Sequence, residues 1–153
     1  MPASESLRSR FTRLAFNFFP AYRGTGGRIT YLADDWSEVT VRVPLSWRTR
    51  NYVGTIFGGS MYGAVDPFFM LMLIKRLGGE YIVWDREATI RFRRPGRTTL
   101  HSRFVIPDDE VSAIRDALPE SGDRIDRSWT VELVDAEGTV HAVVEKVIHI
   151  RKK

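Results

Sequence analysis

The first residues of the chain carry hydrophobic side chains at helical spacing. Over residues 4–19 an apolar residue recurs every three or four positions, which predicts an amphipathic helix capped by Ser4 or Ser6 and ended by Pro20. Such a helix can bind a membrane surface or a partner, but we expect it to pack as a lid on its own domain. A glycine-rich flexible connector is expected over residues 24–27. The stripe consists of Leu7, Phe11, Leu14, Ala15 and Phe18.

Beyond this connector, hydrophobic and polar residues alternate, a pattern typical of strands with one buried face. The expected strands cover residues 28–34, 38–43, 81–94, 98–106, 125–134 and 139–150. Residues 108–118 are expected to form a short surface helix. Polar turn residues at 34–37 and 135–138 predict a hairpin at each end of this series.

Between the second and third strands, residues 58–77 predict a helix that is apolar on every side, and such a helix is buried all round. Lys75 and Arg76 suit its carbonyl-rich end, and a pair of glycines terminates it. An antiparallel sheet with one apolar face can wrap this helix. The order of elements therefore predicts an α+β fold.

Composition limits both the domain count and the available chemistry. A chain of 153 residues with 43% hydrophobic and 27% charged residues can bury one core. We divide it into an N-terminal helix and linker, residues 1–24, and a single domain, residues 25–153. The absence of cysteine excludes disulfide scaffolds, thiolate nucleophiles and Cys-based zinc sites. The three histidines are expected on separate strands, without the spacing of metal ligands, so no metal site is predicted.

No segment predicts secretion or stable membrane insertion. The longest apolar run, residues 61–74, contains Asp66 and Pro67 and is shorter than the ~20 residues needed to span a bilayer. We therefore expect a cytoplasmic protein. The net charge is +4, and arginine, which suits phosphate oxygens, supplies nearly all of the positive charge. A nucleic-acid partner is not expected, because Phe92, the aromatic residue among the arginines, is predicted on the core face.

The start of the long helix holds the residues best suited to chemistry. Gly58 and Gly59 would present backbone N–H groups to an anion or a polarised carbonyl. Asp66 is the only ionisable group in this apolar stretch, and a buried carboxylate must be paired, capped or protonated. Simpler interpretations stay open. The two glycines can form a plain turn, and Asp66 can cap a helix that begins at Pro67.

This segment and the order of elements resemble the hotdog fold, and within it the thioesterase-like DUF4442 family. The resemblance covers about residues 25–150. It implies a long central helix wrapped by an antiparallel sheet, and two copies joined into one continuous sheet with sites at their interface. Dimers can pair further into tetramers. The matching residues are Asn51, Gly54, Phe57-Gly58-Gly59, Asp66-Pro67, Val83-Trp84-Asp85 and Arg94-Pro95-Gly96.

The resemblance also implies roles for individual residues. In the related phenylacetyl-CoA thioesterases an Asn precedes a His-Gly-Gly helix start, and a catalytic Asp follows it. The thioester carbonyl would lie against the glycine N–H groups, and Asp66 of the same or the partner subunit would activate water or attack directly. Asp85, which replaces a hydroxyl residue of those enzymes, would share the proton or the water. The corresponding residues here are Asn51, Phe57, Gly58, Gly59 and Asp66, with Phe57 in place of the His.

Other residues are candidates for binding the substrate. Phe57, Tyr62 and Phe69 would line an acyl pocket, or belong to an ordinary core. Arg93, Arg94 and Arg97 would hold the phosphates of coenzyme A, or form a solvated strand face. Asp85 has an alternative as a surface carboxylate paired with Arg86 or Arg103.

Two functions follow as hypotheses. The first is hydrolysis of an acyl-CoA thioester with a hydrophobic acyl chain at a dimer interface. No cofactor would be needed, since coenzyme A is part of the substrate. The alternative is a non-catalytic hotdog module that binds acyl-CoA, a fatty acid or another apolar ligand, an interpretation that Phe57 favours.

Overall fold

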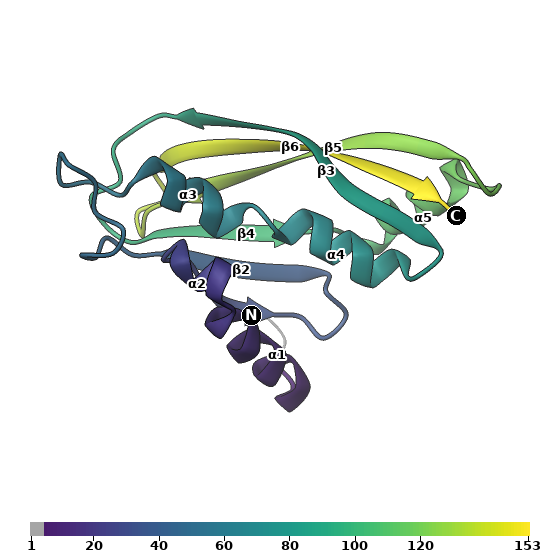
Figure 1. The fold of residues 1–153 in the computed structure, drawn as a ribbon, viewed down its shortest axis with the longest axis horizontal. Helices are drawn as coiled ribbons and strands as arrows, with labels where there is room; N and C mark the ends of the chain where they lie inside the picture. The colour runs from purple at the N-terminus through teal and green to yellow at the C-terminus, as the bar shows by residue number, and fades with distance from the viewer. Residues whose placement is uncertain (1–4) are drawn as a thin grey trace.

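An antiparallel sheet with a helical segment on one face makes up most of residues 5–153, which are the residues that the computed structural model describes (Figure 1). The strand order is β1-β2-β4-β5-β6-β3, so β1 and β3 form the two edges. The predicted α+β class is confirmed. The strands are β1 (Arg28–Leu32), β2 (Glu38–Val43), β3 (Tyr81–Phe92), β4 (Leu100–Val105), β5 (Arg124–Val134) and β6 (Val140–Lys152). The helices are α1 (Leu7–Phe18), α2 (Pro20–Gly24), α3 (Gly58–Val65), α4 (Phe68–Leu77) and α5 (Asp108–Ala117).

The core lies between the helices α3 and α4 and the inner face of the sheet. Alternation along β2 turns Val39, Val41 and Val43 inward, and all three are buried. Phe68 of α4 meets Phe104 of β4 with ring centroids 5.2 Å apart. Burying one such side chain contributes about 1.5–3 kcal/mol. Packing against the sheet therefore stabilises α4 far more than helix propensity does.

The single helix expected over residues 58–77 is in fact two helices, separated by Asp66 and Pro67. Pro67 has no N–H and cannot donate to the carbonyl four residues earlier, so the hydrogen-bond ladder is interrupted. Both residues keep right-handed helical torsion angles, with φ of −51° and −81°, and α4 continues along the sheet. The expectation of burial on every side is wrong, because Ile74 is exposed and Met70 is partly exposed.

The N-terminal helix contacts its own domain, as expected, but with its polar side. Ser6 caps α1 by accepting a hydrogen bond from the Ser9 N–H at 3.2 Å, whereas Ser4 lies outside the described residues. Ser9 is buried, and the predicted apolar stripe points to solvent. Pro20 ends α1 and also opens α2, since its missing N–H is harmless in a first turn. Part of the expected connector, up to Gly24, is therefore helical.

The segment around α2 packs into the core of the sheet and helices. The Tyr22 hydroxyl donates to the Ala64 carbonyl at 2.9 Å, and burial raises the pKa of Tyr22. Gly27 allows this close approach, since a Cβ there would lie 2.7 Å from the Cβ of Ala64. The ring of Phe16 lies 5.9 Å from that of Phe68. These contacts join the N-terminal segment to the core; the division after residue 24 stays a prediction.

Within residues 5–153, none of the helices combines the length and hydrophobicity that crossing a bilayer requires. His141 and His149, expected on different strands, both belong to β6. They stand near its two ends, roughly 26 Å apart at the rise of a strand, and cannot meet at one ion.

Candidate active site

A buried lysine joins two carboxylates beneath the junction of α3 and α4. Lys146 of β6 is 1% exposed, and its Nζ lies 2.5 Å from Asp66 Oδ1 and 2.8 Å from Asp85 Oδ2. The Nζ also donates to the Asp66 carbonyl at 3.1 Å and contacts the Tyr62 hydroxyl at 3.2 Å. The Tyr62 hydroxyl donates to the same Asp66 oxygen at 2.7 Å. We call Tyr62, Asp66, Asp85 and Lys146 the Lys146 cluster.

A β-bulge in β3 explains why Asp85 reaches this cluster. The register with β6 shifts between Asp85 and Glu87, so one extra residue, Arg86, enters β3. Asp85 stands opposite Ile148, and Ala88 stands opposite Lys146. Because directly opposed residues share a face of the sheet, the bulge places both an odd-numbered and an even-numbered residue of β3 on the inner face.

The charges of the cluster balance only in part, since two carboxylates surround one ammonium group. Burial lowers the pKa of Lys146, but its hydrogen bonds with Asp66 and Asp85 outweigh this and hold that pKa above its ordinary value. Burial and the hydrogen bond to Asp66 raise the pKa of Tyr62, so its hydroxyl stays a neutral donor. One ammonium group between two carboxylates leaves the cluster with a single net negative charge.

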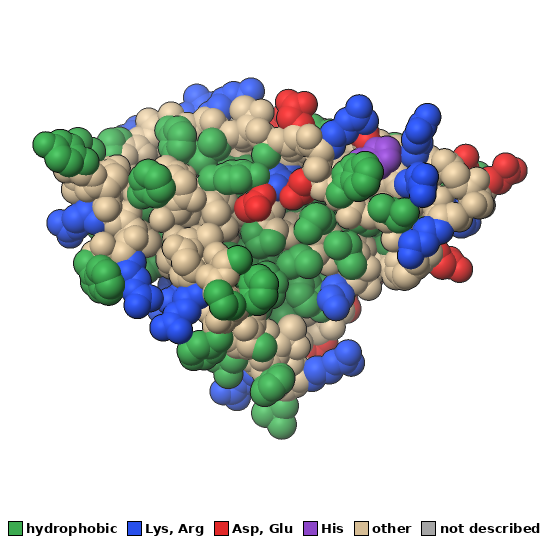
Figure 2. Space-filling view, in the orientation of Figure 1, with side chains coloured by type: hydrophobic (Ala, Val, Ile, Leu, Met, Phe, Trp, Pro, Cys, Tyr) green, Lys and Arg blue, Asp and Glu red, His purple; other side chains and the backbone are tan. Residues whose placement is uncertain are grey.

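Asp66 is the more exposed of the two carboxylates of the cluster. Its side chain keeps 44% of its surface exposed, against 26% for Asp85 and 1% for Lys146. Figure 2 shows acidic side chains in the middle of this face, over the junction of α3 and α4. Within residues 5–153, the Asp85 Oδ1 is buried and has no hydrogen-bond partner. A donor on a water or a ligand would stabilise it.

The simpler interpretations of the two aspartates are wrong. Asp66 ends α3, and its side chain bonds Lys146 and Tyr62; α4 begins without a side-chain cap. It is therefore not the cap of a helix that begins at Pro67. Asp85 is not paired with an arginine. The two arginines considered for it bind other acids: Arg86 pairs with Asp126 at 2.7 Å and Arg103 with Glu38 at 2.7 Å.

The start of α3 forms the wall of a separate cavity of about 300 Å³. Gly58 lies under the ring of Phe92, where a Cβ would be 3.0 Å from the nearest ring atom. Phe92 is on the helix-facing side of the sheet, as expected, opposite the buried Ala142, but 57% of its surface is exposed. The first N–H groups of α3 have no partner within the helix. The cavity is lined by Asn51, Thr55, Ile56, Gly58, Met61, Phe92, Arg93, Arg94, Pro95 and Gly96.

The loop before α3 is held by Asn51. Its side-chain amide donates to Thr55 Oγ1 at 2.9 Å, and its oxygen accepts from the N–H groups of Val53 and Thr55. These bonds fix the loop that leads into the helix. The predicted role of Asn51 in orienting a substrate stays a prediction.

The remaining predicted residues are divided between surface and core. Phe57 is exposed at the start of α3, and its ring lies against Gly59. Phe69 is buried and stacks on Trp129, so it belongs to the core rather than to either site. Arg97 is exposed and does not line the cavity that Arg93 and Arg94 line.

The structure thus brings the predicted residues together in two groups. Gly58 and Asp66 are eight residues apart along a nearly continuous helix, which corresponds to roughly 12 Å. A single carbonyl group cannot touch both within one copy of the chain. Tyr62, Asp66 and Asp85 form one group with Lys146, which the sequence analysis missed. The other group surrounds the helix start.

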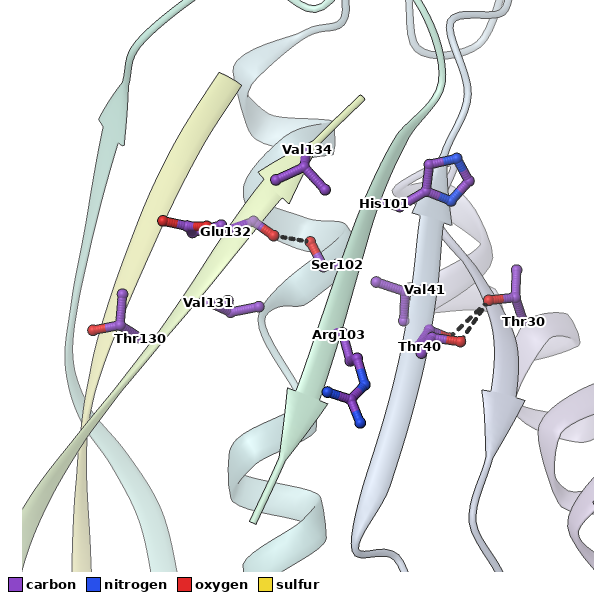
Figure 3. Close-up of a pocket in the computed structure, with 10 residues that line it drawn as sticks. All are labelled: Thr30, Thr40, Val41, His101, Ser102, Arg103, Thr130, Val131, Glu132 and Val134. Atoms are coloured by element: carbon purple, nitrogen blue, oxygen red, sulfur yellow. Dashed lines mark hydrogen bonds between the residues drawn. The ribbon is translucent and has the colours of Figure 1, made fainter. Parts of the chain in front are cut away.

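A larger cavity of about 580 Å³ opens where β4 and β5 diverge (Figure 3). The two strands pair only at His101 and Val134, and beyond this point Ser102 Oγ donates to the Glu132 carbonyl at 2.7 Å. None of the residues predicted for catalysis or binding lines this cavity.

Comparison with known proteins gives a family and a fold. The model of the family described as "Domain of unknown function (DUF4442)" matches residues 8–150. No curated protein sequence matches the chain.

Several solved structures are similar over nearly the whole chain. PA5026 from Pseudomonas aeruginosa, a protein of unknown function described as a probable thioesterase, is 20% identical with a TM-score of 0.81 and coverage of 97% of this chain and 99% of that one. The thioesterase HI1161 from Haemophilus influenzae is 14% identical, with a TM-score of 0.69 and coverage of 97% and 93%. A protein of unknown function from Chlorobaculum tepidum, OLEI01261, is 16% identical, with a TM-score of 0.73 and coverage of 95% of each chain.

Proposed function

This chain belongs to the DUF4442 family and has the hotdog fold, and from that premise we propose that it hydrolyses acyl-CoA thioesters with a hydrophobic acyl chain. Two of the three similar structures named above are described as a thioesterase or a probable thioesterase, which supports this reaction class. The observation that carries the proposal is the Lys146 cluster. It holds the more exposed of its two carboxylates, that of Asp66, in a fixed position on an otherwise apolar helix face.

A dimer would bring the two groups of residues together. The strand β3 spans twelve residues at an edge of the sheet, with Trp84 and Phe92 exposed on it, and an uncovered edge of this length favours pairing with another strand. Antiparallel pairing of β3 across a two-fold axis would set the α3–α4 helices of the two copies side by side in opposite directions. Asp66 of one copy would then approach the helix start of the other.

The chemistry needs only the protein, the substrate and water. The thioester carbonyl oxygen would accept hydrogen bonds from the N–H groups of Gly58 and Gly59, which stabilise the oxyanion as it forms. Asp66 would take a proton from water while the water oxygen attacks the carbonyl carbon. The oxyanion then collapses and the C–S bond breaks, the thiolate of coenzyme A leaves and takes the proton back from Asp66, and the carboxylic acid is released. Lys146 and Tyr62 would hold the carboxylate of Asp66 in position throughout.

The remaining contacts would involve the coenzyme. Arg93 and Arg94 at the helix-start cavity, with Arg97 nearby in sequence, would pair with its phosphates. Coenzyme A enters as part of the substrate, and no separate cofactor is required.

The direct test replaces Asp66 by Asn and measures thiol release from a panel of acyl-CoA thioesters. General base catalysis contributes about 10²–10⁴ in rate, so we expect D66N to lower kcat at least a hundredfold. D126N is a matched control, because Asp126 is an exposed carboxylate held by Arg86 and His149 on the outer side of the sheet. Equal activity of D66N and the unsubstituted chain would overturn the role of Asp66. If the unsubstituted chain hydrolyses none of the thioesters in the panel, the proposed activity is overturned.

One observation favours the alternative of a non-catalytic binding module. Phe57 occupies the helix start where the related thioesterases have His, and its ring is 57% exposed. A module of this kind would bind an acyl-CoA or a fatty acid saturably and release no thiol. The same assay, run with a binding measurement, separates the two functions.

A further inference from the structure

The helix α1 is amphipathic, and its polar side is the one that contacts the rest of the protein. Ser9 is buried and its hydroxyl donates to Asp34. The side chain of Asn17 bonds both the N–H and the carbonyl of Ile29 on β1, at 2.8 and 3.0 Å. These hydrogen bonds fix the rotation of the helix about its own axis.

This rotation leaves the apolar stripe in solvent. Leu7 is 83% exposed, Phe11 75% and Phe18 66%, and Leu14 lies between them on the same side. Figure 2 shows hydrophobic side chains gathered at the lower end of the molecule, where Figure 1 places α1, with basic side chains on both sides. A helix of a soluble domain normally turns its apolar stripe toward the core. A continuous exposed apolar face on one helix therefore indicates a binding surface.

The exposed charges beside this stripe are basic, and Glu5, at the start of α1, is held by Arg13 at 2.8 Å. No Asp or Glu occurs between Glu5 and Asp34, whereas five arginines do. Arg8 and Arg10 are exposed and flank the stripe on either side at helical spacing. The guanidinium carbon of Arg23 lies 5.6 Å from the ring of Phe18.

A groove beside α2 extends the same combination of aromatic and basic residues. Trp47 is 83% exposed there, with the guanidinium of Arg48 5.0 Å from its ring. Pro20 and Arg23 line the other side of the groove. Tryptophan favours the boundary between lipid headgroups and acyl chains, and arginine beside it can reach phosphate groups.

The position of α1 in the fold keeps this surface free. The helix packs on β1, and β1 and β3 are opposite edges of the sheet. A dimer formed through β3 would therefore leave α1 uncovered.

From these observations we propose that the apolar face of α1 binds the surface of a bilayer that contains anionic phospholipids. The helix lies in the plane of the interface, with Phe11, Leu14 and Phe18 at the depth of the first acyl carbons. The flanking arginines contact lipid phosphates. The protein is held at the membrane by this face alone, and no helix of residues 5–153 is long and apolar enough to enter it further. This inference does not depend on the proposed hydrolysis.

Co-sedimentation of the full chain with vesicles tests the proposal. We expect binding to vesicles of equal parts phosphatidylcholine and phosphatidylglycerol, weaker binding to phosphatidylcholine alone, and a loss of binding at high salt. The double variant F11S/F18S lowers the vesicle–water partition coefficient by roughly tenfold or more, because two aromatic side chains no longer enter the interface. The variant R8Q/R10Q lowers it roughly fivefold for each arginine. V105S, at an exposed apolar position of β4, is the matched control and binds as the unsubstituted chain does.

Other outcomes would overturn the proposal. Equal sedimentation of F11S/F18S and the unsubstituted chain would show that the stripe is not the binding surface. The absence of sedimentation with anionic vesicles, together with a smaller particle mass for F11S/F18S than for the unsubstituted chain in light scattering, would assign the stripe to contact with another copy of the chain.

Discussion

Lys146 is the residue on which the electrostatics of the candidate site depends. The alternation of β6 predicts that it points inward, among Val144 and Ile148, and a lone lysine there would be strongly destabilising. What the sequence pattern could not supply was the pair of acids that neutralises it. Asp66 comes from a helix eighty residues earlier, and Asp85 from a strand whose register is set by a bulge.

Removal of this ammonium group is expected to destabilise the fold. In K146M two carboxylates face each other without a cation, and loss of one partner of a buried ion pair costs about 3–5 kcal/mol of unfolding free energy. D85N/K146M removes the repulsion and should recover part of that loss, which urea denaturation can measure. If K146M is as stable as the unsubstituted chain, the cluster does not carry the charge balance described here.

The pH dependence of stability provides a second measurement on the same residue. Because the pKa of Lys146 is raised in the folded state, its contribution to stability is complete at neutral pH and decreases as the pH rises above about 10.4. We expect the unfolding free energy of the unsubstituted chain to fall in this range more steeply than that of K146M. Parallel curves for the two proteins would contradict this.

The elements of the fold were predictable wherever their periodicity was local. The hairpins and α5 follow from alternation and turn residues, and their bounds differ from the expected ones by a few residues at most. The break at Pro67 is also local, because it follows from the missing N–H of the proline, and a helix beginning there was one of the two interpretations left open. The bulge at Arg86 and the rotation of α1 were not predictable in the same way. Each depends on a partner distant in sequence, such as Asp34 and Ile29 for α1.

The bulge in β3 can be tested by deleting Arg86. A strand without the extra residue cannot keep both Asp85 and Ala88 on the inner face. Either Asp85 turns outward and Lys146 loses this partner, or the apolar residues of β3 that follow the deletion turn outward. We expect a loss of at least about 3 kcal/mol in thermal or urea denaturation. R86A is the matched control and should cost less than about 1 kcal/mol, because it removes only a surface ion pair with Asp126. Equal losses for the two variants would show that the extra residue does not matter.

At the scale of the whole molecule, the candidate site is divided between the middle of the α3–α4 segment and its start. The sequence indicated Gly58 and Gly59 in one part and Asp66 and Asp85 in the other, but not Lys146. It could not indicate their separation of roughly 12 Å along one helix, which follows from the geometry of the helix itself. The separation is the physical reason for proposing a site shared by two copies joined at β3.

Mixed dimers test this shared site most directly. D66N and G58V chains are each expected to be inactive alone, since one lacks the carboxylate and the other has a blocked helix start. If one copy supplies Asp66 and the other the helix start, a mixed dimer has one site with both defects and one intact site. When the two variants are mixed in equal amounts, unfolded and refolded together, half of the dimers are mixed. The mixture should then show about a quarter of the thiol-release rate of the unsubstituted chain. A mixture no more active than either variant alone would contradict a site shared between two copies.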